Sequence, residues 1–378
     1  MNKIKVVHIL NSVGGVDVSL RIILKNIDNQ NFENVVIHGL EDTNTEFKDK
    51  DGKIIKEYKI PIQRNISPLK DSSSISKAIK ILRKEKPDII HAHSAKGGII
   101  AKIATTFLKI PVLHTPQAYS FMSGQSKIKK TIFLSIEKMF VGPNNKILAS
   151  STSEQNRAIN EVGYPIEQAL LFNNSIKPIS TIQSLSIDKT WPDNYICSVG
   201  RPSYQKNIEL MLDVLNKIRK SISDIHLVLM GVGFHSPNLE TVKKKIRVLN
   251  LESNITLLEW TTREDIFNII KKSQLYLTTA RYEGLPYAVI ESLALSKPIV
   301  ATDADGNRDL VIDNFNGRLI FNEDVKELSQ SVVGIINSEE QKQMFSINSL
   351  KMFNENFNII NNIGNLENIY RNNVKLKK

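Results

Sequence analysis

Short apolar runs alternate with helix-length segments along most of the 378-residue chain. Most of these runs are continuous, which is typical of strands buried on both faces of a parallel sheet. We expect two series of strands, separated by a polar stretch at 178–194. The first series is Ile4–Leu10, Val35–His38, Asp88–Ala92, Pro111–His114 and Lys146–Ala149, and the second is Tyr195–Val199, His226–Met230, Ile255–Leu258, Leu275–Thr278 and Pro298–Ala301.

Helix-length patterns lie between the strands, for example at 18–27, 74–84, 208–221 and 262–272. The β-α-β order predicts an α/β protein with doubly wound parallel sheets. The stretch 178–194 is rich in Ser, Thr, Asp and Pro, so we interpret it as a linker between two Rossmann-like domains, 1–177 and 195–355. Because ligands bind at the carboxyl ends of such strands, the cleft between the domains is the expected site.

Charge and cysteine content narrow the function classes. Fifty Lys and Arg against 39 Asp and Glu give a formal net charge of +11, which favours nucleotide diphosphates, acidic lipids or nucleic acid as partners. No nucleic-acid-binding motif accompanies the basic clusters, so nucleic acid is not expected. The single Cys197 cannot form an internal disulfide, and the run Ile4–Leu10 is too short for a signal peptide. We therefore expect a cytoplasmic protein.

The segment Arg281–Ala294 carries two glutamates after a predicted strand. Pro286 suits the first turn of a helix, so Glu283 and Gly284 fall in a strand-to-helix loop, where free N–H groups attract phosphate. Glu291 lies eight positions after Glu283, a rise of about 12 Å even in one continuous helix. The two carboxylates are therefore not a proton-sharing pair. Either they hold two parts of one extended ligand, or Glu291 is only solvated.

A second loop, Gly200 to Asn207, also follows a predicted strand. Arg201 and Lys206 in this loop could both reach one diphosphate, Arg as a bidentate fork and Lys as a point charge. By themselves they could equally be solvated loop cations. In the first domain, Gly14 and Gly15 suit a tight loop near a ligand, although they lack the spacing of a dinucleotide fingerprint.

Histidines end one strand of the first domain. His91 and His93 could suggest a metal, but no third ligand stands at helical spacing, so a structural or acceptor-lining role is expected. Asp303 and Asp305 have the letters of a DxD motif in a loop before a predicted helix, and we expect no metal there.

The two-glutamate segment resembles the Glu-seven residues-Glu motif of the retaining glycosyltransferases of family 4, which have the GT-B fold. The likeness is strong over Tyr195–Gly317 and moderate over Pro87–Phe121 and Ser150–Ile176. It includes the following stretches: Tyr282–Pro286, Glu291–Ala294, Lys297–Thr302, Gly306-Asn307, Asp309–Val311 and Asn316-Gly317. The resemblance also implies that the last residues, 356–378, can form a helix that packs back on the first domain.

The resemblance implies a role for each matching residue. Arg201 and Lys206 neutralise the leaving diphosphate, Glu283 meets the donor sugar, and Glu291 binds the ribose hydroxyls. Further donor contacts come from the loop residues Gly14, Gly15, Gly200, Gly284, Leu285 and Pro286. Enzymes of this type are generally independent of metal, so no cofactor and no metal are expected.

Two segments of the first domain, His91–Gly98 and His114–Phe121, resemble a branch of family 4 that builds bacterial capsule, O-antigen and exopolysaccharide. Most members have a His where this chain has Gln117. Gln117 can form hydrogen bonds to the donor but cannot act as an acid or base at neutral pH. On the acceptor side, the resemblance points to His93, Lys96 and Tyr119.

The sequence thus predicts a hexosyltransferase that moves a sugar from a nucleoside diphosphate sugar, preferably a UDP-sugar, to a saccharide acceptor that is lipid-linked. The basic amphipathic stretch 126–140 could place it on the inner face of the cytoplasmic membrane or could simply face the core. A sugar-nucleotide epimerase of GT-B shape and a catalytically silent nucleotide-sugar-binding module are the alternatives.

Overall fold

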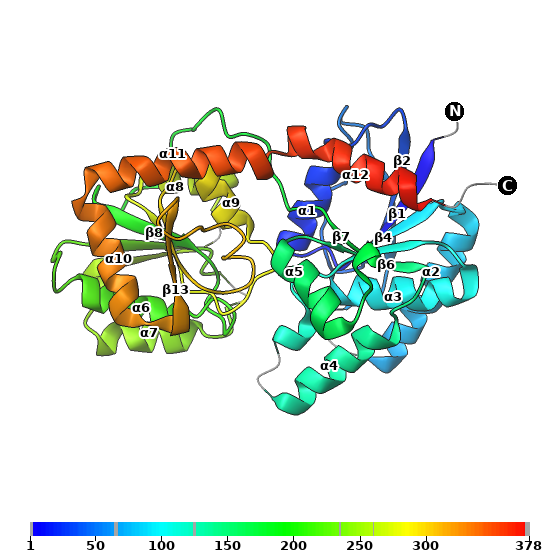
Figure 1. The fold of residues 1–378 in the computed structure, drawn as a ribbon, viewed down its shortest axis with the longest axis horizontal. Helices are drawn as coiled ribbons and strands as arrows, with labels where there is room; N and C mark the ends of the chain where they lie inside the picture. Colours follow the sequence, from blue (N-terminus) through cyan, green and yellow to red (C-terminus); the bar gives the residue numbers. More distant parts are fainter. Residues whose placement is uncertain (1–2, 64–66, 124–125, 234–235, 260, 375–378) are drawn as a thin grey trace. The chain divides into compact units, whose positions relative to one another are not determined.

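The computed structural model describes residues 3–63, 67–123, 126–233, 236–259 and 261–374, so the last four positions of the predicted tail lie outside the described residues. The chain divides into two compact units. The first comprises Met1–Ser175 and Ile359–Lys378, and the second comprises Ile176–Asn358. Each unit contains one parallel sheet with helices on its faces (Figure 1).

The sheet of the first unit has seven strands in the order β3-β2-β1-β4-β5-β6-β7. Every neighbouring pair is parallel, and the order reverses direction between β1 and β4, which is the doubly wound pattern. The strands are β1 (Ile4–Ile9), β2 (Phe32–Gly39), β3 (Lys56–Ile60), β4 (Ile89–His93), β5 (Val112–Thr115), β6 (Asn145–Ala149) and β7 (Ala169–Leu171). The helices of eight or more residues are α1 (Gly15–Leu24), α2 (Pro68–Glu85), α3 (Ser94–Leu108), α4 (Lys127–Met139) and α12 (Ile359–Asn373), and the shorter α5 spans Thr152–Arg157.

The second unit repeats the design with six strands in the order β10-β9-β8-β11-β12-β13. Its switch point lies between β8 and β11, and its described strand pairs are again parallel. The strands are β8 (Tyr195–Val199), β9 (His226–Met230), β10 (Ile255–Leu258), β11 (Tyr276–Thr278), β12 (Ile299–Thr302) and β13 (Gly317–Ile320). The helices are α6 (Ile208–Ile218), α7 (Leu239–Val248), α8 (Arg263–Lys272), α9 (Tyr287–Ala294), α10 (Val325–Asn337) and α11 (Glu339–Asn356).

The predicted linker at 178–194 packs on the second unit instead of standing between two domains. Ser186 donates its backbone N–H to Asp265 Oδ1 at 2.7 Å, and Asn268 donates to the carbonyl of Gln183 at 2.6 Å. Trp191 is buried, with 5% of its surface exposed. The first segment of the first unit therefore ends at Ser175, and the second unit spans 176–358 rather than 195–355.

The last helix, α12, belongs to the first unit although it follows the second in sequence. Its Leu366 and Tyr370 are fully buried in the same apolar cluster as Val6, Ile89 and Leu113. The Tyr370 ring also lies 5.8 Å from that of Phe32. Burial of this helix face against the strands is the main source of its stability, because propensity alone rarely sustains a helix of this length. The chain thus closes the first unit with its C-terminal helix.

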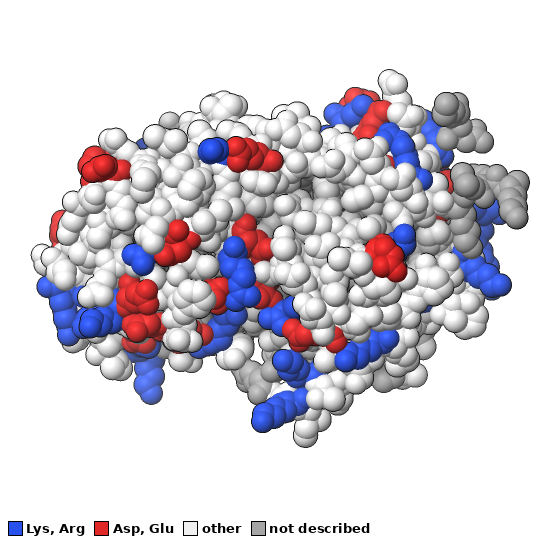
Figure 2. All heavy atoms as spheres, viewed as in Figure 1, with Lys and Arg blue, Asp and Glu red and all other residues white. Residues whose placement is uncertain are grey.

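Helix α4 carries an apolar stripe that faces away from the core. Ile128, Ile132 and Met139 are exposed by 73%, 53% and 72%, and their spacing places them on one side of the helix. Exposed lysines border this stripe, and Lys and Arg side chains gather in Figure 2 over the area that α4 occupies in Figure 1. A buried ion pair between Glu137 and Lys102 of α3, with 2.9 Å between Oε2 and Nζ, fixes the opposite side. None of the described helices is long and apolar enough to cross a bilayer.

Candidate active site

Three loops meet at the carboxyl ends of strands β8, β11 and β12, next to the switch point of the second sheet. The backbone N–H of Arg281 donates to the carbonyl of Gln205 at 2.8 Å, which ties the loop after β11 to the loop after β8. The N–H of Glu283 donates to the carbonyl of Asp305 at 3.0 Å, which ties it to the loop after β12. Open α/β sheets bind their ligands at this edge and at this point. The predicted donor residues of the second unit therefore share one edge of one sheet.

Two glycines allow the loops to approach this closely. A side chain at Gly200 would crowd the methylene groups of Lys206 at 3.1 to 3.3 Å. A side chain at Gly306 would come within 2.8 Å of the Glu283 Cβ and 3.0 Å of the Gly284 carbonyl oxygen. Gly306 also has a φ of +79°, which other residues rarely adopt. The glycines thus make room for the charged side chains beside them.

Lys206 and Glu283 form an ion pair with 2.7 Å between Nζ and Oε1. Gln205 donates its side-chain N–H to the other carboxylate oxygen of Glu283 at 3.0 Å. The Lys206 side chain is 23% exposed and that of Glu283 is 10% exposed, so both are held in position but remain accessible. A lysine in this state can exchange its carboxylate partner for a phosphate oxygen. Sequence reasoning did not identify Gln205.

Glu291 lies on α9 and is bound by Arg263, the first residue of α8. Arg263 donates two hydrogen bonds to Glu291 Oε1, from Nε at 3.0 Å and from the terminal nitrogen at 2.7 Å. Burial raises the pKa of Glu291, and the Arg263 guanidinium opposes that rise. The two glutamates of the motif have different cationic partners, in agreement with the prediction that they do not share a proton. Arg263 had no signal in the sequence, because 28 residues separate it from Glu291.

The remaining predicted donor residues of the second unit lie in the same loops. Arg201 is half-buried and directly follows Gly200, while Gly284, Leu285 and Pro286 are buried immediately before α9. Pro286 is the N-cap of α9 rather than its first helical residue. The DxD-like carboxylates of the β12 loop each pair with Arg308, which donates at 2.7 Å to Asp303 and at 2.9 Å to Asp305. The roles of these residues in donor binding remain predictions.

In the first unit, Gly14 is the N-cap of α1 with a φ of +61° and Gly15 is its first residue, so the pair does form a tight turn after β1. Gln117 follows β5 with a φ of +53°, an unusual conformation for a non-glycine residue. Its side-chain nitrogen is buried and has no hydrogen-bond partner among the described residues. An unpaired buried donor is costly, and a bound ligand oxygen would satisfy it. This geometry suits the donor-binding role predicted for Gln117.

Two of the residues predicted to contact the acceptor are not at a surface. His93 is fully buried and Tyr119 is 1% exposed, packed on Phe121 with 4.9 Å between ring centroids. The third, Lys96, pairs with Asp71, with both carboxylate oxygens 2.8 Å from its Nζ. The prediction that His93 and Tyr119 line the acceptor is therefore not supported, because their side chains belong to the interior. The burial of His93 and Tyr119 could not be predicted from their residue types.

His93 belongs instead to a buried histidine cluster. His8 from the neighbouring strand β1 provides the third member that the sequence pattern lacked, and one ring nitrogen from each of His8, His91 and His93 lies within 4.8 Å of the others. His8 Nδ1 is 3.1 Å from His93 Nε2, and His91 Nδ1 is 2.7 Å from the Tyr370 hydroxyl. These nitrogens could hold a metal ion, but both ring nitrogens of His8 and of His91 already have hydrogen-bond partners, and only His93 Nδ1 lacks one among the described residues.

Burial sets the charge of this cluster. It lowers the pKa of His8 to about 4, and it lowers the pKa values of His91 and His93 well below the usual range, with further lowering by neighbouring histidines. All three are therefore neutral at physiological pH. Each can then donate through one ring nitrogen and accept through the other. We interpret the cluster as a structural network that joins β1, β4 and α12.

Comparisons with known proteins identify the families that the two units match. The model of the Glycosyltransferase Family 4 domain matches residues 13–176, and the model of Glycosyl transferases group 1 matches residues 183–352. The chain is 26% identical over 328 residues to the UDP-Gal:alpha-D-GlcNAc-diphosphoundecaprenol alpha-1,3-galactosyltransferase of Escherichia coli, which covers 81% of each chain. It is 22% identical to the capsular polysaccharide biosynthesis glycosyltransferase CapM of Staphylococcus aureus, over 81% of this chain and 84% of CapM.

The fold comparison gives the same result. Sucrose-phosphate synthase from Thermosynechococcus elongatus superimposes with a TM-score of 0.83 over 98% of this chain and 99% of its own, at 15% identity. The predicted two-sheet GT-B fold is thereby confirmed. The relatives named as glycosyltransferases do not favour the alternative of a sugar-nucleotide epimerase. The two family models together span both units, and the two relatives, both named as glycosyltransferases, cover four fifths of the chain. The protein is therefore an enzyme that belongs to the family 4 glycosyltransferases.

Proposed function

We propose that this glycosyltransferase moves a sugar from a UDP-sugar to a hydroxyl of a lipid-linked saccharide in cell-surface polysaccharide synthesis. The observation that carries the donor half is the Lys206–Glu283 pair, held at 2.7 Å where three loops meet. The relative in Escherichia coli is named for a UDP-Gal donor and a diphosphoundecaprenol-linked acceptor, and CapM is named for capsular polysaccharide. These names support the same classes of donor and acceptor for this chain.

In the proposed reaction the anomeric carbon keeps its configuration. The bond between that carbon and the diphosphate oxygen breaks, and a bond to the acceptor oxygen forms on the same face. The acceptor proton passes to the leaving phosphate, so no protein base is required. This assignment fits Gln117, which can bind the donor but cannot take a proton.

Each charged residue of the second unit then has one task. Arg201 and Lys206 stabilise the negative charge that develops on the leaving diphosphate, which replaces the work of a metal ion. Glu283 contacts the sugar and, before the donor binds, keeps Lys206 in position. Glu291, oriented by Arg263, accepts hydrogen bonds from the ribose hydroxyls. Binding energy and charge stabilisation would thus come from different residues.

The donor is identified first. Thermal-shift measurements with UDP, GDP and their common sugars should give the largest rise in melting temperature with one uridine nucleotide, because only the ligand that binds the folded state stabilises it. The best donor is then incubated with short lipid-linked saccharides and the product is analysed by NMR. Retention of the anomeric configuration is expected, with activity that survives a chelator. Inversion, or loss of activity in chelator, contradicts the proposal, and so does nucleotide binding without turnover.

We further propose that α4 rests on an anionic membrane at the cytoplasmic face. Its exposed stripe of Ile128, Ile132 and Met139 would enter the interface between lipid headgroups and chains, and Lys127, Lys129, Lys130 and Lys138 would contact acidic headgroups. Each lysine near such a surface contributes on the order of 1 kcal/mol. A lipid-linked acceptor would then be presented at the surface where the enzyme sits.

Vesicle co-sedimentation tests this placement. The protein should bind vesicles that contain acidic lipid, bind purely zwitterionic vesicles weakly, and be released by salt, which screens the lysines. Replacing Ile128, Ile132 and Met139 by Ser should abolish binding. The same change at Ile360, which is 61% exposed on α12, is the control and should have no effect. Equal binding by the triple variant and the wild type would exclude α4 as the contact.

A further inference from the structure

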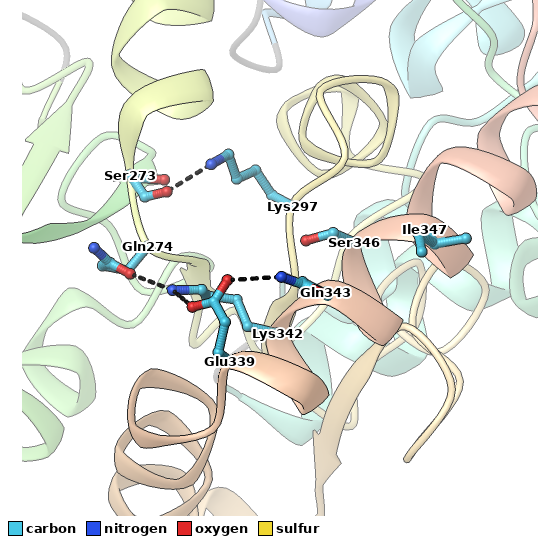
Figure 3. Close-up of a pocket in the computed structure, with 8 residues that line it drawn as sticks. All are labelled: Ser273, Gln274, Lys297, Glu339, Lys342, Gln343, Ser346 and Ile347. Atoms are coloured by element: carbon cyan, nitrogen blue, oxygen red, sulfur yellow. Dashed lines mark hydrogen bonds and ion pairs between the residues drawn. The ribbon is translucent and has the colours of Figure 1, made fainter.

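A polar cavity lies in the second unit, away from the loops that carry the predicted donor-binding residues. It has a volume of about 400 Å³ and is bordered by the start of β12, the end of α8 and the first turns of α11 (Figure 3). Lys297, which directly precedes Pro298, and Lys342 of α11 both line the cavity. Ser346 and Gln343 add a hydroxyl and an amide. The lining is therefore rich in hydrogen-bond donors.

The topology separates this cavity from the predicted donor site. Lys297 and Gln274 stand just before β12 and β11, at the amino ends of these strands. Glu283 follows β11 at its carboxyl end. In a parallel sheet the two ends lie on opposite edges, so a ligand here could not touch the Lys206–Glu283 pair. The cavity is not a part of the donor site.

The cations of the cavity are only partly neutralised. Lys297 Nζ donates to the backbone carbonyl of Ser273 at 2.6 Å, not to a carboxylate. Lys342 pairs with Glu339, with 2.7 Å between Nζ and Oε2, but Glu339 is 64% exposed and contributes little in water. Lys271 of α8 adds a third positive charge near Lys297. The positive charges of Lys297, Lys342 and Lys271 thus repel one another, and a bound anion would reduce this repulsion.

The titration of Lys297 reflects the same crowding. Burial, together with the charges of Lys271 and Lys342, lowers the pKa of Lys297 to about 8. Cys197 of β8 opposes this effect only in its thiolate form, and burial raises the pKa of the Cys197 thiol to about 12. Glu339 is the one carboxylate that borders the described cavity. A bound anion would therefore hold Lys297 in its charged state.

We propose that this cavity is a second anion site, which binds the phosphate group of a small phosphorylated molecule between Lys297 and Lys342. Both lysines border the cavity, and each would exchange its present neutral partner, the Ser273 carbonyl for Lys297 and the Gln274 amide for Lys342, for a phosphate oxygen. The Ser346 hydroxyl and the Gln343 amide, which now donates to Glu339 Oε1 at 3.3 Å, supply further donors. The volume exceeds what a bare phosphate needs and falls in the range of small-molecule pockets. The site is independent of the sugar-transfer proposal, since none of its residues takes part in that reaction.

Calorimetric titration of the full chain with inorganic phosphate, and separately with a hexose phosphate, tests the proposal. Both should bind saturably to the wild type, and tighter binding of the hexose phosphate identifies a metabolite site instead of a simple oxyanion site. Lys297→Met and Lys342→Gln should each weaken phosphate binding about tenfold or more, because each removes a charged hydrogen bond. Glu339→Gln should strengthen it. Lys342→Gln also keeps the test valid if Lys297→Met fails to fold.

Two controls make the test specific. Lys351→Met alters an exposed lysine of the same helix outside the cavity and should bind phosphate as the wild type does. Lys206→Ala alters the donor site and should remove only the phosphate binding that occurs there, leaving the binding that depends on Lys297 and Lys342. Sulfate, whose charge is constant, should bind more weakly as the pH rises through about 8 and Lys297 loses its proton. Unchanged binding in Lys297→Met and Lys342→Gln, loss of binding only in Lys206→Ala, or no saturable binding at all would overturn the proposal.

Discussion

The two parallel sheets of this protein have the same winding, but their carboxyl edges carry opposite chemistry. In the second unit, charged side chains lie in pairs beyond the strands, Lys206 with Glu283 in two loops and Arg263 of α8 with Glu291 of α9. In the first unit β1 and β4 end in neutral, buried histidines that bond to one another and to Tyr370. The edge of the second unit carries ion pairs that a charged ligand can replace, whereas in the first unit the histidines bond to one another, and the Gln117 side-chain nitrogen has no partner among the described residues.

This difference teaches that position at a strand end does not by itself make a residue functional. The buried glutamates of this edge are each paired with a cation, because burying an unpaired charge is costly, and a phosphate can take the place of Glu283 beside the partly exposed Lys206. A neutral histidine can be buried at a smaller cost than a charged group, most of all where both ring nitrogens have partners, as in His8 and His91. The same topological place therefore supports binding in one unit and cohesion in the other.

The largest expected effect lies in the charged pair. Lys206→Ala should lower kcat for sugar transfer by about 10²- to 10³-fold, as expected when a group that stabilises developing charge is lost. Lys217→Ala, at an exposed position of α6, is the matched control and should leave the rate unchanged. Initial rates with the best donor provide the measurement. An unaltered kcat in Lys206→Ala, and likewise in Glu283→Ala, would mean that the active site has been placed wrongly.

A smaller effect, on stability alone, is expected in the histidine cluster. Tyr370→Phe removes the hydroxyl 2.7 Å from His91 Nδ1 and leaves that buried nitrogen unpaired, which should cost about 1–3 kcal/mol in the free energy of unfolding. Tyr204→Phe, the same change at a residue 40% exposed, should cost far less. Urea unfolding with hydrogen exchange should locate the loss in residues 1–175 and 359–374. Equal effects of the two changes would refute a structural role for the network.

The smallest effect concerns Arg263. Burial raises the pKa of Glu291 and Arg263 opposes the rise, so Arg263→Met should let that pKa rise further. More Glu291 is then protonated at a given pH and fewer lone pairs remain for the ribose hydroxyls. The donor KM should increase about tenfold at acidic pH and by less as the pH rises, with kcat little changed. Arg263→Lys should restore part of the affinity, and an increase in KM independent of pH would contradict the mechanism.

The central strands of both sheets were predictable from the sequence, whereas of the four edge strands only β10 was predicted. The ten predicted strands correspond to β1, β2, β4, β5 and β6 of the first sheet and to β8 through β12 of the second. The three strands that were not predicted, β3, β7 and β13, all lie at sheet edges. A continuous apolar run is the signature of burial on both faces, and an edge strand such as Lys56–Ile60 is too exposed to require one.

The unit boundaries were visible only in part. Low periodicity at 178–194 suggested a linker, but Ser186 and Trp191 are held on the second unit by a hydrogen bond and by burial. Polar composition reports the absence of regular structure, and it does not report whether a segment packs. Helical periodicity in the last residues was visible, whereas the place where that helix packs depends on Tyr370 and Leu366 meeting strands from the start of the chain.

By itself, the sequence determined the alternation of strands and helices, the family motif and the types of its functional residues, because these depend on neighbours a few positions apart. The partners were decided by tertiary structure. Gln205 and Glu283 are 78 residues apart, Arg263 and Glu291 are 28 apart, and His8 and His93 are 85 apart. Only the strand order brings each pair to one edge, and only burial there decides which groups stay charged and accessible and which become neutral and enclosed.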